Sequence, residues 1–294
     1  MAVYCSMMNI LTSIAILASA LFGAADFLGG LASTRAPTYS VVVVSQAAGV
    51  VLLAVALPLL PAATLTPADL SWGAAAGCAG GIGVALLYRG LASGPMSVVA
   101  PVTAVCAVVV PVVVGLWLGD RPSTLTLGGI ALAVTAVGLA GQSVQADEPA
   151  RAGSHRWRAF GLAISAGIMI GLFLVALGRT PASAGLWPLV AARAVSVSLF
   201  TTIALAAGDP IVLKGRPAVY AIAGGTLDML ANFGYLAAVR HGPLSVMATL
   251  ASLYPATTVL LARFFLHERL TRTRILGIGA ALAAIVIIVG SSSR

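Results

Sequence analysis

Charged residues are scarce in this sequence. Asp, Glu, Lys and Arg make up 8% of its 294 residues, whereas apolar residues make up 60%. A soluble globule of this composition would leave large apolar patches in water, so the sequence predicts a polytopic helical membrane protein. The formal net charge of +8 does not indicate nucleic-acid binding, because most Lys and Arg residues lie in short connectors where topology and lipid phosphate account for them.

Cysteine is also rare, and its arrangement argues against two kinds of site. Cys5, Cys78 and Cys106 are odd in number and have no metal-ligand spacing, so we expect neither a disulfide framework nor a metal site. A Walker-type phosphate loop is absent as well. We therefore expect no cofactor, and a transporter built from this chain would use an ion gradient, exchange or the gradient of its own substrate.

Long apolar runs dominate what is present. About 20 apolar residues are needed for a helix to cross the hydrocarbon layer. Ten runs of adequate length occur, at residues 9–31, 38–60, 70–91, 97–119, 124–142, 158–178, 183–206, 217–238, 243–266 and 272–290. The first run lacks a basic flank and has the length of a retained helix rather than of a signal peptide. The polar segment 142–158 divides the runs into two groups of five, which predicts a first repeat over 1–145, a linker over 146–157 and a second repeat over 158–294.

An internal repeat supports this division. Residues 94–121 align without a gap to residues 242–269, with seven of 28 positions identical. Both copies open with Gly-Pro-x-Ser-Val, and both close with an acidic residue followed by Arg. The earlier part agrees more weakly: Arg35-Ala36-Pro37 corresponds to Arg179-Thr180-Pro181, and Gln46 falls near Arg193 if three residues are inserted. The chain therefore consists of two related halves.

An odd number of spans in each half has a mechanistic meaning. A duplicated five-helix unit enters the membrane the second time from the opposite side, so the halves are related by a pseudo-two-fold axis in the membrane plane. That inverted arrangement is typical of alternating-access carriers. The sequence thus predicts an all-α membrane protein of ten transmembrane helices in two inverted repeats.

Several short motifs in this order resemble the EamA-type family of the drug/metabolite transporter superfamily. They are the repeated Gly-Pro-x-Ser-Val opening, Phe22-Gly23-x-x-Asp26-Phe27, Leu253-Tyr254-Pro255, and Leu266-His267-Glu268-Arg269-Leu270-Thr271 followed by Gly277. The resemblance covers both halves and is strongest over 217–290. It implies a ten-helix carrier in the cell membrane, commonly an exporter of amino acids, other metabolites or drugs, with a central cavity between the halves. One departure is Asp120, where a Glu is usual.

Polar residues inside the spans are the candidate functional residues. A charge at the centre of a membrane helix costs roughly 2.5 to 3.5 kcal/mol, so it needs a partner, a wet cavity or a function. The candidates for binding a substrate, or a coupling proton or ion, are Asp26, Gln46, Arg193, Asp228, Asn232 and Tyr254. Tyr88 also flanks the expected path. Four residues at matching helix ends are expected to clamp connectors instead: Asp120, Arg121, Glu268 and Arg269.

Arg193 and Asp228 lie at similar depth in consecutive antiparallel spans, which predicts an ion pair between them. The pair could be purely structural, or it could border the cavity, with Asp228 binding a cation or proton and Arg193 a substrate carboxylate. Asn232 lies one turn from Asp228 and extends the same polar face.

Small residues at four-residue spacing predict close helix packing. They occur in three of the predicted spans, at Gly73, Gly77 and Gly81, at Gly115 and Gly119, and at Gly167 and Gly171.

Two alternatives to a transporter are an intramembrane aspartyl enzyme using Asp26 and Asp228, and a non-transporting interaction protein. Neither explains an inverted duplication.

The orientation in the membrane is predicted differently by two arguments. Ten basic residues lie on the face of the 142–158 linker and four on the face of the termini. By the positive-inside rule the linker is then cytoplasmic, whereas the resemblance implies cytoplasmic termini. The linker face carries Arg35, Arg89, Arg151, Arg156, Arg158, Lys214, Arg216, Arg269, Arg272 and Arg274, and the opposite face carries Arg121, Arg179, Arg240 and Arg294.

Overall fold

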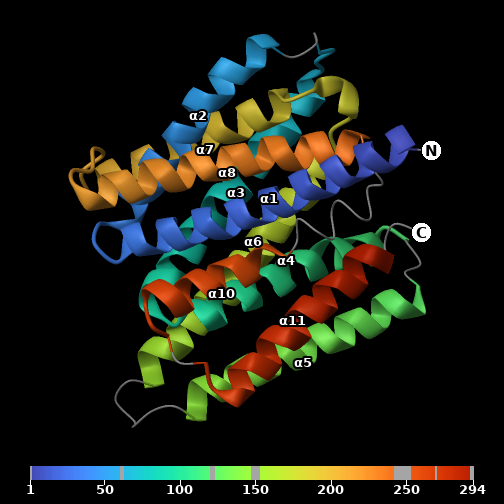
Figure 1. Ribbon diagram of the computed structural model, residues 1–294. Coiled ribbons are helices and arrows are strands. Elements are labelled where there is room, and N and C mark those ends of the chain that lie inside the picture. The colour runs from blue at the N-terminus through green and yellow to red at the C-terminus, as the bar shows by residue number, and fades with distance from the viewer. Residues whose placement is uncertain are drawn as a thin grey trace.

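The chain folds into a bundle of helices (Figure 1). The computed structural model describes residues 2–59, 63–119, 123–146, 153–241, 253–268 and 270–291, and no strand occurs among them. The α-helices are α1 (Ala2–Ser33), α2 (Thr38–Ala56), α3 (Pro67–Ser93), α4 (Met96–Trp117), α5 (Thr124–Ala146), α6 (Gly153–Gly178), α7 (Trp187–Ala206), α8 (Arg216–His241), α10 (Tyr254–Phe265) and α11 (Arg272–Ser291). Two 3₁₀ turns, η1 (Leu57–Leu59) and η2 (Ala182–Ala184), adjoin α2 and α7.

Each predicted apolar run overlaps one of these helices, so the all-helical membrane class is confirmed. Within the described ranges, seven helices are long and apolar enough to cross a membrane. They lie in α1, α2, α3, α4, α6, α7 and α11. Helix α8 carries Asp228 and Asn232 in its middle, which lowers its hydropathy, and the apolar part of α5 is the shorter stretch Thr124–Leu139. The number of ten membrane crossings remains a prediction.

Several helix ends differ from the predicted boundaries. Helix α6 begins at Gly153, inside the predicted linker, because polar residues can continue a helix beyond the hydrocarbon layer. Helix α2 ends at Ala56, since Pro58 follows in the 3₁₀ turn. Helix α7 begins only at Trp187, with Pro188 in its first turn, where a missing backbone N–H does no harm.

Three helix pairs make the most extensive contacts: α1 with α8, α3 with α6, and α5 with α11. Figure 1 shows α1 and α8 lying side by side across the bundle, and α5 and α11 lying together at one edge. Helix α2 packs against both α7 and α8, and α4 packs against α6. The main core cluster joins residues of many helices, including Phe27, Val42, Tyr88 and Met96.

Glycine brings several of these helices into backbone contact, as the four-residue spacing predicts. Gly73 and Gly77 of α3 lie against the backbone of α7 at Pro188 and Ala192. Gly119 is different, because it has nothing around its Cβ position and a φ of +96°. The prediction that Gly119 lies in a helix interface is therefore wrong: it follows the C-terminus of α4 in the left-handed conformation that glycine adopts freely.

Candidate functional site

The predicted ion pair between Arg193 and Asp228 is present. Nη2 of Arg193 on α7 lies 2.5 Å from Oδ2 of Asp228 on α8. The other terminal nitrogen, Nη1, donates a hydrogen bond to Oε1 of Gln46 on α2. The guanidinium is 13% exposed and the carboxylate 30%, so the pair is largely withdrawn from solvent without being sealed. A charge-assisted pair with a third polar partner is how a charge is accommodated inside a membrane helix bundle.

Two further side chains extend this pair into a network. Nδ2 of Asn232 donates to the backbone oxygen of Asp228 at 2.8 Å and reaches its Oδ2 at 3.4 Å. The hydroxyl of Ser196 donates to the backbone oxygen of Arg193 at 3.2 Å and lies 3.5 Å from Oε1 of Gln46. We call Gln46, Arg193, Ser196, Asp228 and Asn232 the polar centre.

Glycines in α8 place Asp228 at this position. Gly225 lies directly against the backbone of Ser45 on α2, and its neighbour Gly224 lies against α1 between Ala25 and Gly29. Helix α8 is thus seated between α1 and α2. Because Asp228 follows these glycines by about one helical turn, its carboxylate emerges on the same side, towards both neighbours.

Asp26 lies on α1, close to the polar centre but outside its hydrogen-bond network. Its side chain is half-buried and makes no hydrogen bond or ion pair to any described residue. Asp228 lies close enough to act on the Asp26 carboxyl group electrostatically. The structure therefore places Asp26 beside the predicted pair, with no counter-ion among the described residues.

Two tyrosines flank Asp26. One turn before it, Gly23 lies against the backbone of Tyr254, and the Tyr254 hydroxyl experiences the charge of Asp26. One turn after it, Gly29 lies against the ring of Tyr88, whose hydroxyl is 3.4 Å from Oγ of Ser45. Tyr254, predicted to line the path, thus lies near Asp26 rather than in contact with Arg193.

Of the predicted helix-end clamps, Glu268 is described. Its Oε1 accepts a hydrogen bond from the backbone N–H of Met96 at 2.7 Å, and its Oε2 accepts one from Ser97 at 3.1 Å. These N–H groups belong to the first turn of α4, so a residue of the second half caps a helix of the first half. Asp120, Arg121 and Arg269 lie outside the described residues.

Sequence reasoning missed Ser196 and Ser45. Ser196 lies three residues after Arg193 and so shares its helix face, and Ser45 directly precedes Gln46. Spacing relative to a charged neighbour was the available signal, but serine is too common in membrane helices for that signal to single out these two.

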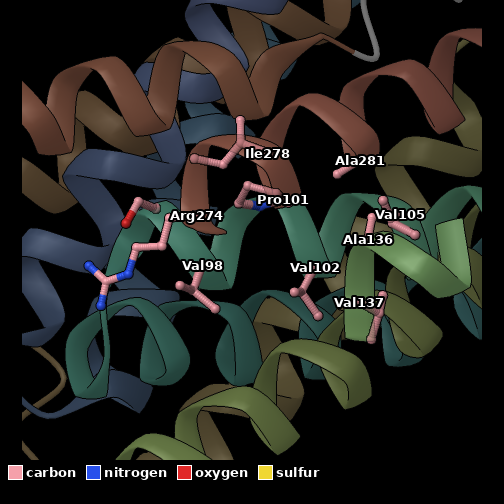
Figure 2. Close-up of a pocket in the computed structure, with 11 residues that line it drawn as sticks. Val98, Pro101, Val102, Val105, Ala136, Val137, Arg274, Ile278 and Ala281 are labelled. Carbon is pink, nitrogen blue, oxygen red and sulfur yellow. The ribbon is translucent and has the colours of Figure 1, made fainter. Parts of the chain in front are cut away.

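A narrow apolar cavity occurs elsewhere, between α4, α5 and α11 (Figure 2). Val98, Val102 and Ile278 are among its lining residues, and Arg274 lies at one end. No predicted substrate-binding residue lines it. Among the described residues, no group of three or more His, Cys, Asp or Glu side chains could hold a metal ion.

Residues 157–290 match the sequence profile of the EamA-like transporter family. The second half of the chain is therefore similar to that family. EamA-like proteins form part of the drug/metabolite transporter superfamily, so the resemblance inferred from the motifs is confirmed over these residues. Together with the seven apolar helices, the EamA-like match identifies a multi-pass membrane protein with a transporter unit.

Solved structures share the fold. One of them, titled only "Crystal structure of protein", is similar with a TM-score of 0.58 over 96% of each chain and 14% sequence identity. At that identity the likeness concerns the fold alone. No curated protein matches the sequence. The EamA-like match is thus the finding that indicates transport.

Proposed function

We propose that this protein is a secondary transporter, an exporter of small metabolites or drugs, that works by alternating access between two inverted five-helix repeats. The observation that carries the proposal is the contact between Gln46 and Arg193, which fall at corresponding places in the two halves if three residues are inserted. A contact between equivalent residues of two units lies on or near the axis that relates them. The polar centre is therefore expected at the interface where such carriers bind their substrates.

The helix contacts support the repeat. If α1 to α5 correspond to α6 to α11 in order, the α1–α8 pair is equivalent to the α6–α3 pair, and both are among the most extensive contacts. The α5–α11 and α2–α7 pairs join equivalent helices, as is expected of helices that lie next to a two-fold axis.

Two glycine contacts are also related by the proposed repeat. Gly77 lies against the backbone of Ala192, and Gly225 lies against the backbone of Ser45. Gly77 and Gly225 differ by the repeat offset of 148, and Ser45 and Ala192 differ by 147, the spacing that also separates Gln46 from Arg193. Two backbone contacts at matching positions support an inverted repeat that extends beyond the aligned segment 94–121.

The polar centre suggests how substrate is recognised. The Arg193 guanidinium on α7 is bound to Asp228 of α8 and to Gln46 of α2. These bonds therefore depend on how the three helices are placed relative to one another. A polar substrate entering here competes for these hydrogen bonds. Loosening them frees α2, α7 and α8 to shift against one another, and this coupling of binding to helix movement is what alternating access requires.

The same geometry disfavours an aspartyl enzyme. A catalytic aspartate dyad shares one proton between two carboxyl groups, and an arginine bound to one of them opposes that sharing. Asp228 is bound to Arg193.

A purely structural ion pair remains a second interpretation of Arg193 and Asp228, and the variants described in the Discussion separate it from a transport function.

Reconstitution tests the proposal. The purified protein in liposomes is offered labelled amino acids and labelled cationic drugs, with and without an imposed pH gradient. We expect saturable, protein-dependent movement of at least one solute, reduced when Arg193 and Asp228 are both neutralised. A control variant, Gly279→Ala, changes a position with open space around it and should transport normally. Equal fluxes with and without protein for every solute would refute the proposal.

A further inference from the structure

The carboxyl group of Asp26 has no ion-pair partner among the described residues. Arg193 and Asp228 lie inside α7 and α8 and form an ion pair with each other, and Asp26 lies in the last third of α1. Asp26 makes no ion pair or hydrogen bond to any described residue, and Asp228 acts on it electrostatically. A carboxyl group inside a membrane helix without a counter-charge is either protonated or met by a cation that enters from outside.

Asp26 has a tyrosine at each end of its helix face. Gly23, Asp26 and Gly29 are spaced three residues apart and share one face of α1. Tyr254 lies at the Gly23 end of that face, with its ring edge-on to Phe22 at a centroid distance of 6.4 Å. The ring of Tyr88 lies at the Gly29 end. A carboxylate between two aromatic rings favours an organic cation, because the ring faces attract positive charge.

Resting on the transporter function proposed above, we propose that Asp26, with the rings of Tyr88 and Tyr254, binds the cationic group of the substrate, and that the substrate class is monovalent organic amines and ammonium ions. An anion would meet unfavourable conditions here. Both terminal nitrogens of Arg193 are already engaged, one by Asp228 and one by Gln46. An anionic group that bound Nη2 of Arg193 would have to displace Asp228, which would leave a second carboxyl group without a counter-ion.

A permanently charged probe tests this assignment. Benzyltrimethylammonium carries one positive charge that no proton can neutralise, and neopentylbenzene is its uncharged carbon isostere. We expect the full-length protein in lipid nanodiscs to bind the cation and not the isostere in calorimetric titrations. Asp26→Asn should weaken binding of the cation at least about tenfold, the loss typical of one charge-assisted contact. Tyr254→Leu should weaken it several-fold, whereas Tyr254→Phe keeps the ring and should bind nearly normally.

The control is Asp209→Asn, which neutralises a carboxylate in the connector between α7 and α8 and should bind benzyltrimethylammonium like the unaltered protein. A second measurement needs no variant. Dicyclohexylcarbodiimide modifies carboxyl groups inside membrane proteins, and mass spectrometry of the labelled peptides reports its reaction at Asp26. Benzyltrimethylammonium should slow that reaction several-fold, and neopentylbenzene should not.

Two outcomes would overturn the assignment: equal binding of the cation by Asp26→Asn and the unaltered protein, or no binding of the cation at all. Uptake of labelled leucine in liposomes then distinguishes two failures. If leucine is transported and Asp26→Asn transports it equally, the cation assignment is wrong and the transporter function stands. If neither leucine nor benzyltrimethylammonium is transported by the unaltered protein, the proposed function fails as well.

Discussion

Arg193 donates a hydrogen bond to Gln46, a residue 147 positions earlier in the chain. The two residues occupy equivalent positions when the halves are aligned with a three-residue insertion. In the proposed repeat, one position therefore carries an amide in one half and a guanidinium in the other, and these two side chains form a hydrogen bond.

Neutralising one partner of the ion pair should destabilise the protein. Asp228→Asn leaves Arg193 with Gln46 but without a carboxylate. Because the Asp228 side chain is 30% exposed, we expect a loss of about 1 to 3 kcal/mol in the free energy of unfolding, less than for a fully buried pair. Thermal unfolding in detergent measures it.

The double variant Arg193→Gln with Asp228→Asn separates a structural role from a functional one. It restores neutrality, so stability should largely return. If the pair also serves transport, activity should stay low although the protein is folded. Recovery of both stability and transport in the double variant would instead show that the pair only holds the helices together.

The glycine contact of α8 should be sensitive to a single methyl group. A Cβ at Gly225 would overlap the carbonyl oxygen and Cα of Ser45, which are backbone atoms that cannot move aside. Gly225→Ala should therefore cost about 1 to 3 kcal/mol of stability and separate α8 from α2. At Gly279 nothing lies within 4 Å, so Gly279→Ala in the same helical bundle should be nearly neutral. Equal melting temperatures for the two variants would contradict the close approach.

Sequence reasoning found the charged residues of the site because such residues are rare inside apolar runs. Asp26, Arg193 and Asp228 stand out for that reason, and similar depth in neighbouring spans was enough to predict the pair. Helix partners were harder to predict. Residues of α1 are apolar on nearly every side, so periodicity does not reveal which face meets α8.

Glycine spacing indicated where backbones approach, but it did not identify the partner. Gly73 and Gly77 face α7, as the contacts show, whereas Gly119 has the same spacing and ends a helix. Glu268 was predicted to act at a helix end, yet its contact with α4 joins residues about 170 positions apart. Contacts between residues so far apart in the chain depend on the tertiary arrangement and produce no pattern in the local sequence.

The cap at the start of α4 gives a separate prediction. Glu268→Gln replaces one accepting oxygen by an NH₂ group that faces a backbone N–H donor. We expect a loss of about 1 kcal/mol in stability, with binding of substrate in the polar centre unchanged. Asp209→Asn serves as the matched control for a change of charge in a connector. An unaltered melting temperature for Glu268→Gln would show that the two hydrogen bonds contribute nothing to stability.

The orientation can be decided by labelling one added cysteine. Cys5, Cys78 and Cys106 are first replaced by serine or alanine, and Ser154 near the start of α6 is changed to cysteine. The count of basic residues predicts a cytoplasmic linker, so an impermeant maleimide should not label this cysteine in intact cells but should label it after lysis. Ready labelling in intact cells would place the linker outside and the termini in the cytoplasm.

Under the proposed repeat, the polar residues are distributed unequally over the two halves. At the repeat offsets, Asp228 corresponds to Gly80 and Asp26 corresponds to Ile170. There, Gly80 lies against the ring of Phe173, and Ile170 lies against Gly83, so apolar packing fills the place that carboxylates occupy in the other copy. A carrier of two identical halves would present the same binding surface to either side of the membrane. In this chain the two halves differ, so the binding surface exposed to one side of the membrane should differ from the surface exposed to the other. The apparent affinity for a substrate should therefore depend on the side from which it is offered.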